Sequence, residues 1–177
     1  MPSSPRTSAA AATEHQHAVQ EFIAAARAVP DRDWERPLDH EKWSPAQVAE
    51  HLRLTYATVA NEMAGGSGLR IRTPWLLRVM LRWRILPRIL ASGAIPEGAK
   101  APREIRPGDG PFDRDQVLSA LATSAKVAEE ALVQHWSDGA GHMTHHVFGK
   151  LDAPTAMRFA TVHARHHARQ LAPRATT

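Results

Sequence analysis

Residues 44–63, SPAQVAEHLRLTYATVANEM, carry the clearest structural signal in the chain. Ser44 places a hydroxyl directly before Pro45, and Gln47 follows at the third helical position. This is the pattern of a capping box, with a proline at the first helical position where its missing N–H does no harm. Apolar residues then recur at helical spacing until a glycine pair ends the segment. The sequence therefore predicts an amphipathic helix here.

Three further segments show the same spacing of apolar residues at three and four positions. The first helix is expected from about Thr13 to Val29, where a proline follows it. Asp113 is the expected start of another helix, and Asp152 is the expected N-cap of the last helix, which runs to about Leu171. Alternating β-branched runs are missing. We therefore predict an all-α fold, a four-helix bundle with a long crossover between its second and third main helices.

The expected crossover contains one more helix, from about Thr73 to Leu90, and then the extended ordered loop PEGAKAPREIRPGDGP. The stretch from about Gly139 to Gly149 is expected to be a loop. The resulting organisation is a flexible N-terminal tail over residues 1–12, one domain over residues 13–171 and a C-terminal tail over residues 172–177.

The composition excludes several classes of protein. With 177 residues, 43% hydrophobic and 23% charged, the chain is an ordinary globular one, neither disordered nor fibrous. The absence of cysteine excludes a disulfide framework, a thiolate zinc site, an iron–sulfur cluster and a catalytic cysteine. No apolar run approaches the ~20 residues of a membrane span, and the N-terminus lacks the apolar core of a signal peptide. The expected location is therefore the cytoplasm.

Histidine is frequent, with 11 residues, and two of them share a face of the last expected helix. His163 and His167 are four residues apart, so their rings lie one turn apart and can bind one ion. His51 lies in the apolar stripe of the helix over residues 44–63 and offers a third ligand. His166 competes for the same role, since spacing alone does not choose between it and its neighbour. A purely structural role for the pair also stays open.

Two blocks of sequence resemble the DinB/YfiT-like superfamily of metal-binding four-helix bundles. WSPAQVAEHL, residues 43–52, resembles the start of that superfamily's second helix. HHVFGKLDAPTAMRFATVHARHHARQL, residues 145–171, resembles its C-terminal signature, in which an H-x-x-F-G loop precedes a helix with H-x-x-H-H-x-x-Q. The segment ASGAIPEGAKAP resembles the connector of one uncharacterised branch, although His146 stands where that branch often has proline.

The resemblance implies roles for particular residues. It assigns His51, His163 and His167 as the metal ligands. It places His145, His166 and Gln170 around the site or in its pocket, where Gln170 can orient a ligand or a bound water. It identifies no catalytic side chain.

Three neutral imidazoles leave a divalent ion its full charge, so that it can lower the pKa of a bound water, bind a thiolate or polarise a carbonyl. Zinc and nickel suit imidazole best, and iron and manganese stay open. The resemblance implies metal-dependent hydrolysis, or transfer with a low-molecular-weight thiol such as bacillithiol or mycothiol. We therefore expect a metal-dependent hydrolase or thiol-dependent S-transferase acting on a small molecule. The alternative is a non-catalytic bundle that binds a metal or a small molecule.

Residues 70–88 alternate arginine with Trp, Leu, Val, Met and Ile, without any acidic residue. The functional alternatives are binding to anionic lipid, to nucleic acid or to an anionic substrate. We favour a crossover helix that packs its apolar face on the bundle and solvates its arginines, so neither nucleic acid nor a membrane is an expected partner. A homodimer through this surface is compatible with its composition. Elsewhere, His15 is expected at a surface or a helix end, and Glu50 is expected to face solvent.

Overall fold

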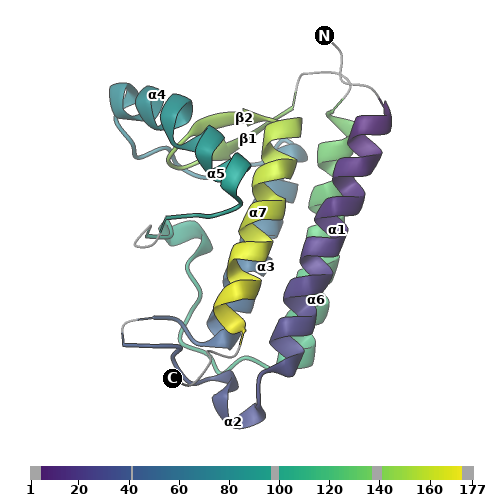
Figure 1. Cartoon of the computed structure of the whole chain (residues 1–177), viewed down its shortest axis with the longest axis vertical. Helices are drawn as coiled ribbons and strands as arrows, with labels where there is room; N and C mark the ends of the chain where they lie inside the picture. Colours follow the sequence, from purple (N-terminus) through teal and green to yellow (C-terminus); the bar gives the residue numbers. More distant parts are fainter. Residues whose placement is uncertain (1–4, 41, 97–99, 137–140, 173–177) are drawn as a thin grey trace.

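Four long helices form the body of the molecule (Figure 1). The computed structural model describes residues 5–40, 42–96, 100–136 and 141–172. Within them α1 lies beside α7, and α3 lies beside α6. The predominance of helix confirms the predicted all-α four-helix bundle. The four helices are α1 (Pro5–Ala28), α3 (Pro45–Met63), α6 (Arg114–Gln134) and α7 (Ala153–Leu171).

The predicted starts of three helices are confirmed by side-chain caps. The Ser44 hydroxyl accepts the backbone N–H of Gln47 at 3.2 Å, and the Gln47 side chain accepts the N–H of Ser44 at 3.1 Å. The Asp113 carboxylate caps α6 and the Asp152 carboxylate caps α7, each accepting a backbone N–H three residues later. These caps satisfy N–H groups that the first turn of a helix leaves without an internal partner.

The first helix begins at Pro5 rather than near Thr13. The Thr13 hydroxyl does not cap a helix start, because it donates to the carbonyl of Ala9 inside the helix, at 3.0 Å. The alanines before Thr13 are strong helix formers and continue the helix toward the N-terminus. Part of the expected N-terminal tail is therefore helical, whereas residues 1–4 and 173–177 lie outside the described residues.

The crossover contains two helices where the sequence predicted one. They are α4 (Trp75–Arg84) and α5 (Leu86–Ser92), and they meet at Ile85. Pro87 explains the break, because proline is tolerated in the first turn of a helix but not in its interior. A 3-10 turn, η1 (Arg103–Ile105), lies in the loop that follows. Another short helix, α2 (Asp31–Trp34), lies between the first two long helices.

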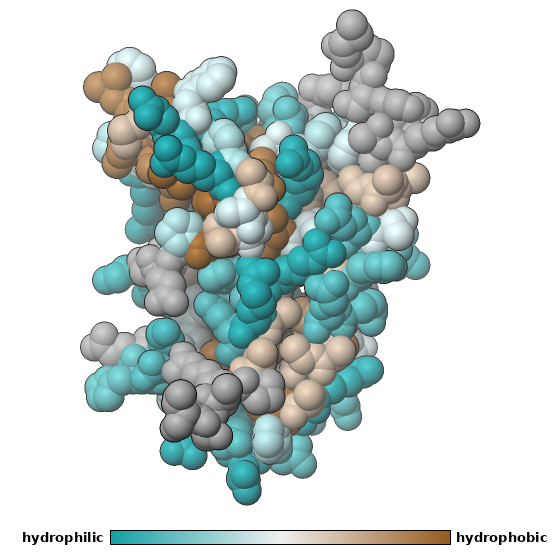
Figure 2. All heavy atoms as spheres, in the orientation of Figure 1, coloured by the Kyte–Doolittle hydropathy of each residue, from teal (hydrophilic) through white to brown (hydrophobic). Residues whose placement is uncertain are grey.

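The expected packing of α4 is wrong. None of its residues is buried, and Trp75 and Trp83 are 64% and 76% exposed. Two of its arginines contact the hairpin, since Arg82 donates to the backbone carbonyl of Lys150 and the stem of Arg78 lies against Gly149. Leu81 is the apolar residue of α4 that packs, partly buried, against the core. Figure 2 shows the resulting apolar surface, in brown, at the upper left over α4.

A small hairpin lies where the sequence predicted a loop. Its strands, β1 (His142–His145) and β2 (Gly149–Asp152), are antiparallel. Met143 pairs with Leu151, and both side chains are buried, so the hairpin has one apolar face on the core. Gly149 adopts a φ of 75°, a conformation that glycine accepts without strain.

No helix in the described part of the chain is long and apolar enough to cross a membrane.

Candidate metal centre

A cavity of about 1200 Å³ lies between the long helices, the crossover and the hairpin. Leu81, Ile85 and Ile89 supply apolar side chains from α4 and α5, and histidines of α3 and α7 also line the cavity. Natural ligand pockets measure roughly 300–1,000 Å³. The cavity is therefore large enough for a small molecule, and the crossover forms part of its wall.

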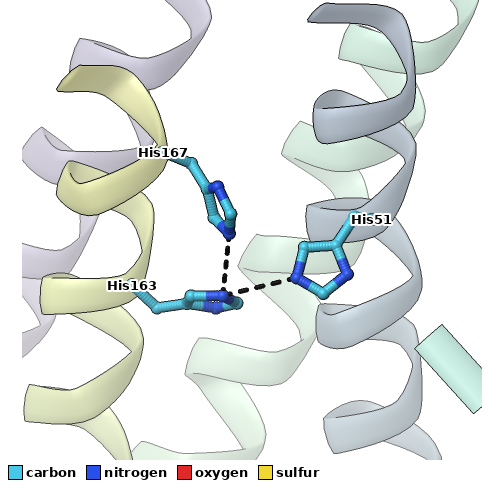
Figure 3. A group of neighbouring side chains, drawn as sticks. All are labelled: His51, His163 and His167. Carbon is cyan, nitrogen blue, oxygen red and sulfur yellow. Dashed lines mark hydrogen bonds between the residues drawn. The ribbon is translucent and has the colours of Figure 1, made fainter. Parts of the chain in front are cut away.

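Three histidine rings meet in this cavity from two helices (Figure 3). Nε2 of His163 lies 2.9 Å from Nε2 of His167 and 3.4 Å from Nε2 of His51. One nitrogen of each ring lies within 4.8 Å of the corresponding nitrogen of the other two. The structure thus brings together the three residues that the sequence singled out, although His51 is more than a hundred residues away in the chain.

In His51 and His167, the ring nitrogen that faces away from the cluster, Nδ1, is hydrogen-bonded to an oxygen acceptor. Nδ1–H of His51 donates to the carbonyl of Ile105 at 2.7 Å, and Nδ1–H of His167 donates to the side-chain oxygen of Gln170 at 2.8 Å. A proton on Nδ1 leaves the Nε2 lone pair free on the side that faces the cluster. Such outer hydrogen bonds fix the tautomer and the ring orientation of a metal-binding histidine.

The cluster is held in its neutral form. Burial lowers the pKa of His51 to about 4, with a smaller lowering effect from His146. Burial also lowers the pKa of His167 to about 3, and the neighbouring ring of His51 adds to this shift. The pKa of His163 is lowered well below its ordinary value, mainly by burial and then by the adjacent histidines. Neutral imidazole is the form that binds a metal.

The donor set fits a divalent cation. Lone pairs on His51 and His167 point at the same nitrogen of His163, which carries at most one proton and so cannot satisfy both. A cation among the three nitrogens would satisfy all of them. Three neutral nitrogen ligands are the set found in open, catalytic sites, where a further position stays available to water or substrate.

The structure gives His166 and His167 different roles, because His167 belongs to the histidine cluster and His166 does not. The His166 ring contacts the ring of His167 at 5.2 Å, and its Nε2 lies 3.1 Å from the amide nitrogen of Gln170. Gln170 thus links His166 to the outer side of His167. This arrangement places both residues around the cluster, where the sequence resemblance expected them.

His145 lines the cavity but contributes no atom to the cluster. Its Nδ1 accepts the backbone N–H groups of Val147 and Phe148 at 3.1 and 3.3 Å, which ties it to the hairpin turn. Its ring packs edge-on against Phe159, which in turn stacks on His163. Burial lowers the pKa of His145 to about 3. The first histidine of the H-x-x-F-G motif therefore shapes the turn and the cavity wall.

The position expected for His15 from the sequence is wrong. His15 is 1% exposed, where a surface or helix-end position was expected. Its Nδ1 lies 2.8 Å from the Glu129 carboxylate and its Nε2 lies 3.0 Å from the Tyr56 hydroxyl. All three residues line the same cavity. The signal was present, because His15 continues the apolar stripe of α1 that includes Val19 at the next turn.

Glu50 does not face solvent as expected. It is 9% exposed and forms two hydrogen bonds with the guanidinium of Arg53, both at 2.6 Å. The paired arginine compensates the carboxylate, so Glu50 is satisfied without reaching the cluster.

The fold and the site define a four-helix bundle whose histidine cluster suits a divalent cation. The sequence profile of the DinB superfamily matches residues 13–171. The chain therefore belongs to the DinB superfamily, whose members are metal-binding bundles. No curated protein and no solved structure matches the chain significantly.

Proposed function

We propose that the protein is a metal-dependent enzyme in which His51, His163 and His167 hold one divalent ion. The observation that carries the proposal is the convergence of three Nε2 atoms in a cavity of about 1200 Å³. Zinc and nickel are the first candidates because both suit imidazole, and iron and manganese come next.

The surrounding residues prepare the site for this role. The carbonyl of Ile105 and the side chain of Gln170 hold two of the rings with their Nε2 atoms inward. Phe159 stacks on the third ring, that of His163, and limits its rotation. When bound, the ion would supply the charge that lowers the pKa of a water or stabilises a thiolate. Preorganised rings avoid the cost of ordering the ligands at each binding event.

The reaction that we propose is hydrolysis of a small molecule or transfer of a low-molecular-weight thiol to it. The chain has no cysteine, so a reacting sulfur would come from a second small molecule. The cavity is larger than many pockets for a single ligand, which supports a site with room for both a substrate and a thiol.

Turnover by metal-loaded protein tests the proposal. The chelator-treated protein is reloaded with zinc, nickel, iron or manganese and assayed on esters and amides, and on electrophiles with several thiols. We expect activity that requires the metal, is lost in His51→Ala and is retained in His17→Ala, which alters an exposed histidine of α1. Stoichiometric metal binding without turnover in any of these assays would favour the non-catalytic alternative.

A homodimer through α4, with which the composition of this helix is compatible, also stays a prediction. Trp75, Leu76 and Trp83 of α4 offer an exposed apolar surface for it. Sedimentation of the purified protein, compared with a Trp83→Ser variant, tests whether this surface joins two copies.

A further inference from the structure

A basic pocket of about 600 Å³ adjoins the cavity that contains the histidine cluster. The described residues that line it are Arg72, Lys100, Arg103, Arg106 and His146, together with Ala101 and Pro102. Lys100, Arg106 and His146 also line the larger cavity, so the two spaces share a wall. Among the described residues that line the pocket, none carries a carboxylate.

The four cations of the basic pocket are Arg72, Lys100, Arg103 and Arg106. Among the described residues, none of them forms an ion pair with a carboxylate, whereas arginines elsewhere, such as Arg53 and Arg165, do. Their charges come from separate segments, with Arg72 before α4 and the others around η1. Like charges gathered in a concave site repel one another and attract an anion from solution.

The turn η1 connects the basic pocket to the histidine cluster. The carbonyl of Ile105 accepts the hydrogen bond that orients His51, at 2.7 Å. Ile105 ends η1, which begins at Arg103, and Arg106 follows it directly. The same short turn therefore holds a ring of the cluster and supplies two guanidinium groups to the pocket. A ligand bound by these arginines therefore contacts the turn that orients His51.

His146 offers a further observation that points to a ligand. Its Nδ1 is buried and has no hydrogen-bond partner in the described part of the protein. Burial lowers the pKa of His146, the Glu104 carboxylate raises it, and the Arg72 guanidinium lowers it. Buried polar atoms in folded proteins are nearly always paired. An unpaired nitrogen in the wall of a basic pocket is explained if a bound molecule supplies the partner.

We propose that the basic pocket binds a carboxylate or phosphate group of the molecule whose reacting end lies at His51, His163 and His167. The inference deepens the proposed function and rests on it for the position of the reacting end. It specifies the substrate class, a small organic anion rather than a neutral molecule. Arginine suits this role because its guanidinium donates two parallel hydrogen bonds to a carboxylate or phosphate.

Anion binding by the metal-free protein tests the pocket by itself. Amide resonances are followed by NMR during titration with succinate, with inorganic phosphate and with neutral succinamide. We expect either anion, but not succinamide, to shift the amide resonances of residues 72, 100, 101, 103–106 and 146. The double variant Arg72→Gln/Arg103→Gln is expected to weaken this binding about tenfold or more, because it removes two charge-assisted contacts. Arg84→Gln, an exposed arginine of α4 outside both cavities, should behave as the wild type.

The cobalt-loaded protein tests whether the pocket and the cluster act on one molecule. The affinities of mercaptopropionate and the neutral mercaptoethanol are measured from the thiolate charge-transfer band. We expect the carboxylate-bearing thiol to bind about tenfold tighter, and the double variant to lose this preference while its cobalt affinity is unchanged.

The outcomes separate the two proposals. Equal affinity for both thiols, or an equal preference in the double variant, overturns the link between pocket and cluster. If the anions shift no amide resonances, or shift those of the arginines of α4 equally, the proposal that the basic pocket binds anions is wrong. Failure of cobalt to bind at the histidine cluster overturns the proposed function, and the titration of the metal-free protein then still decides whether the pocket binds anions.

Discussion

Two buried groups of polar side chains lie in the same bundle and differ in how their nitrogen lone pairs are used. In the polar triad of His15, Tyr56 and Glu129, each nitrogen of the His15 ring has a complementary partner. The Glu129 carboxylate can accept a hydrogen bond from Nδ1–H, and the Tyr56 hydroxyl can donate one to Nε2. In the cluster of His51, His163 and His167, nitrogen faces nitrogen. The hydrogen bonds of the first group are complete within the protein, whereas the second group is one that could hold a cation.

The comparison shows that burial and histidine type do not by themselves define a metal site. Both groups line one cavity, and both take a member from α3. What distinguishes them is complementarity. A carboxylate beside a histidine satisfies its ring nitrogen, whereas the outer hydrogen bonds of His51 and His167 leave the Nε2 lone pairs of both rings directed at His163. A substitution in the histidine cluster should therefore remove the metal, whereas a substitution in the polar triad should lower the stability and leave the metal content unchanged.

The largest expected effect is the loss of metal from the histidine cluster. His163→Ala should abolish stoichiometric binding of zinc or nickel, because His163 lies between the other two rings and two ligands bind a divalent ion far more weakly than three. The helical circular dichroism spectrum should be retained. Elemental analysis of the purified variant measures the metal, and full occupancy would remove His163 from the ligand set.

In the polar triad we expect a loss of stability instead. Glu129→Ala leaves the buried ring of His15 without its acceptor, which should lower the free energy of unfolding by about 1–3 kcal/mol. Metal content should be unchanged. Chemical denaturation measures the effect, and Glu130→Ala, at an exposed position of the same helix, is the matched control. A Glu129→Ala protein of normal stability but without metal would reverse the roles of the two groups.

The stability of the metal-free protein should depend on pH through the histidine cluster. The pKa of His51 is about 4 and that of His167 is about 3 in the folded protein, against an ordinary value of 6.5. Between these values the unfolded chain binds protons that the folded chain does not. The free energy of unfolding therefore falls as the pH decreases from 6.5 toward 4, and these two groups contribute no change above this window.

Denaturation at several pH values measures this dependence. The double variant His51→Gln/His167→Gln should show a shallower decrease than the wild type, because it lacks two of the groups that take up protons on unfolding. Identical slopes for the two proteins would show that these rings are not held neutral by burial.

The smallest expected effect comes from the outer hydrogen bond of the cluster. Gln170→Ala removes the acceptor of His167 Nδ1–H and should weaken metal binding by roughly 10–100-fold without abolishing it. Competition with a chromophoric chelator measures the affinity. Gln20→Ala changes an exposed glutamine of α1 and serves as the control. An unchanged affinity in Gln170→Ala would mean that packing alone orients His167.

Local signals in the sequence predicted most of the bundle. Three helix starts were predicted from side chains that can cap the following turn, those of Ser44, Asp113 and Asp152. The structure has all three caps. Such signals need only a few neighbouring residues. The pairing of His163 with His167 is local in the same sense, since one helical turn separates them.

The features that the sequence analysis missed depend on distant contacts. The burial of His15 becomes clear only when Glu129 and Tyr56 are brought to it from two other helices. The orientation of α4 depends on the hairpin, because Gly149 and the Lys150 carbonyl receive its arginines. The position of His51 beside the last helix was inferred with the help of a family resemblance, and the carbonyl of Ile105 that orients it left no signal in the side-chain sequence.

The most direct test of the account is the location of the metal in crystals of the protein loaded with zinc. Diffraction data collected on both sides of the zinc absorption edge give an anomalous map that shows the ion alone. We predict one peak per chain, at ~2.0–2.1 Å from the Nε2 atoms of His51, His163 and His167. A peak at other residues, or no peak at the cluster in fully loaded protein, would contradict the claim that these three histidines form a metal site.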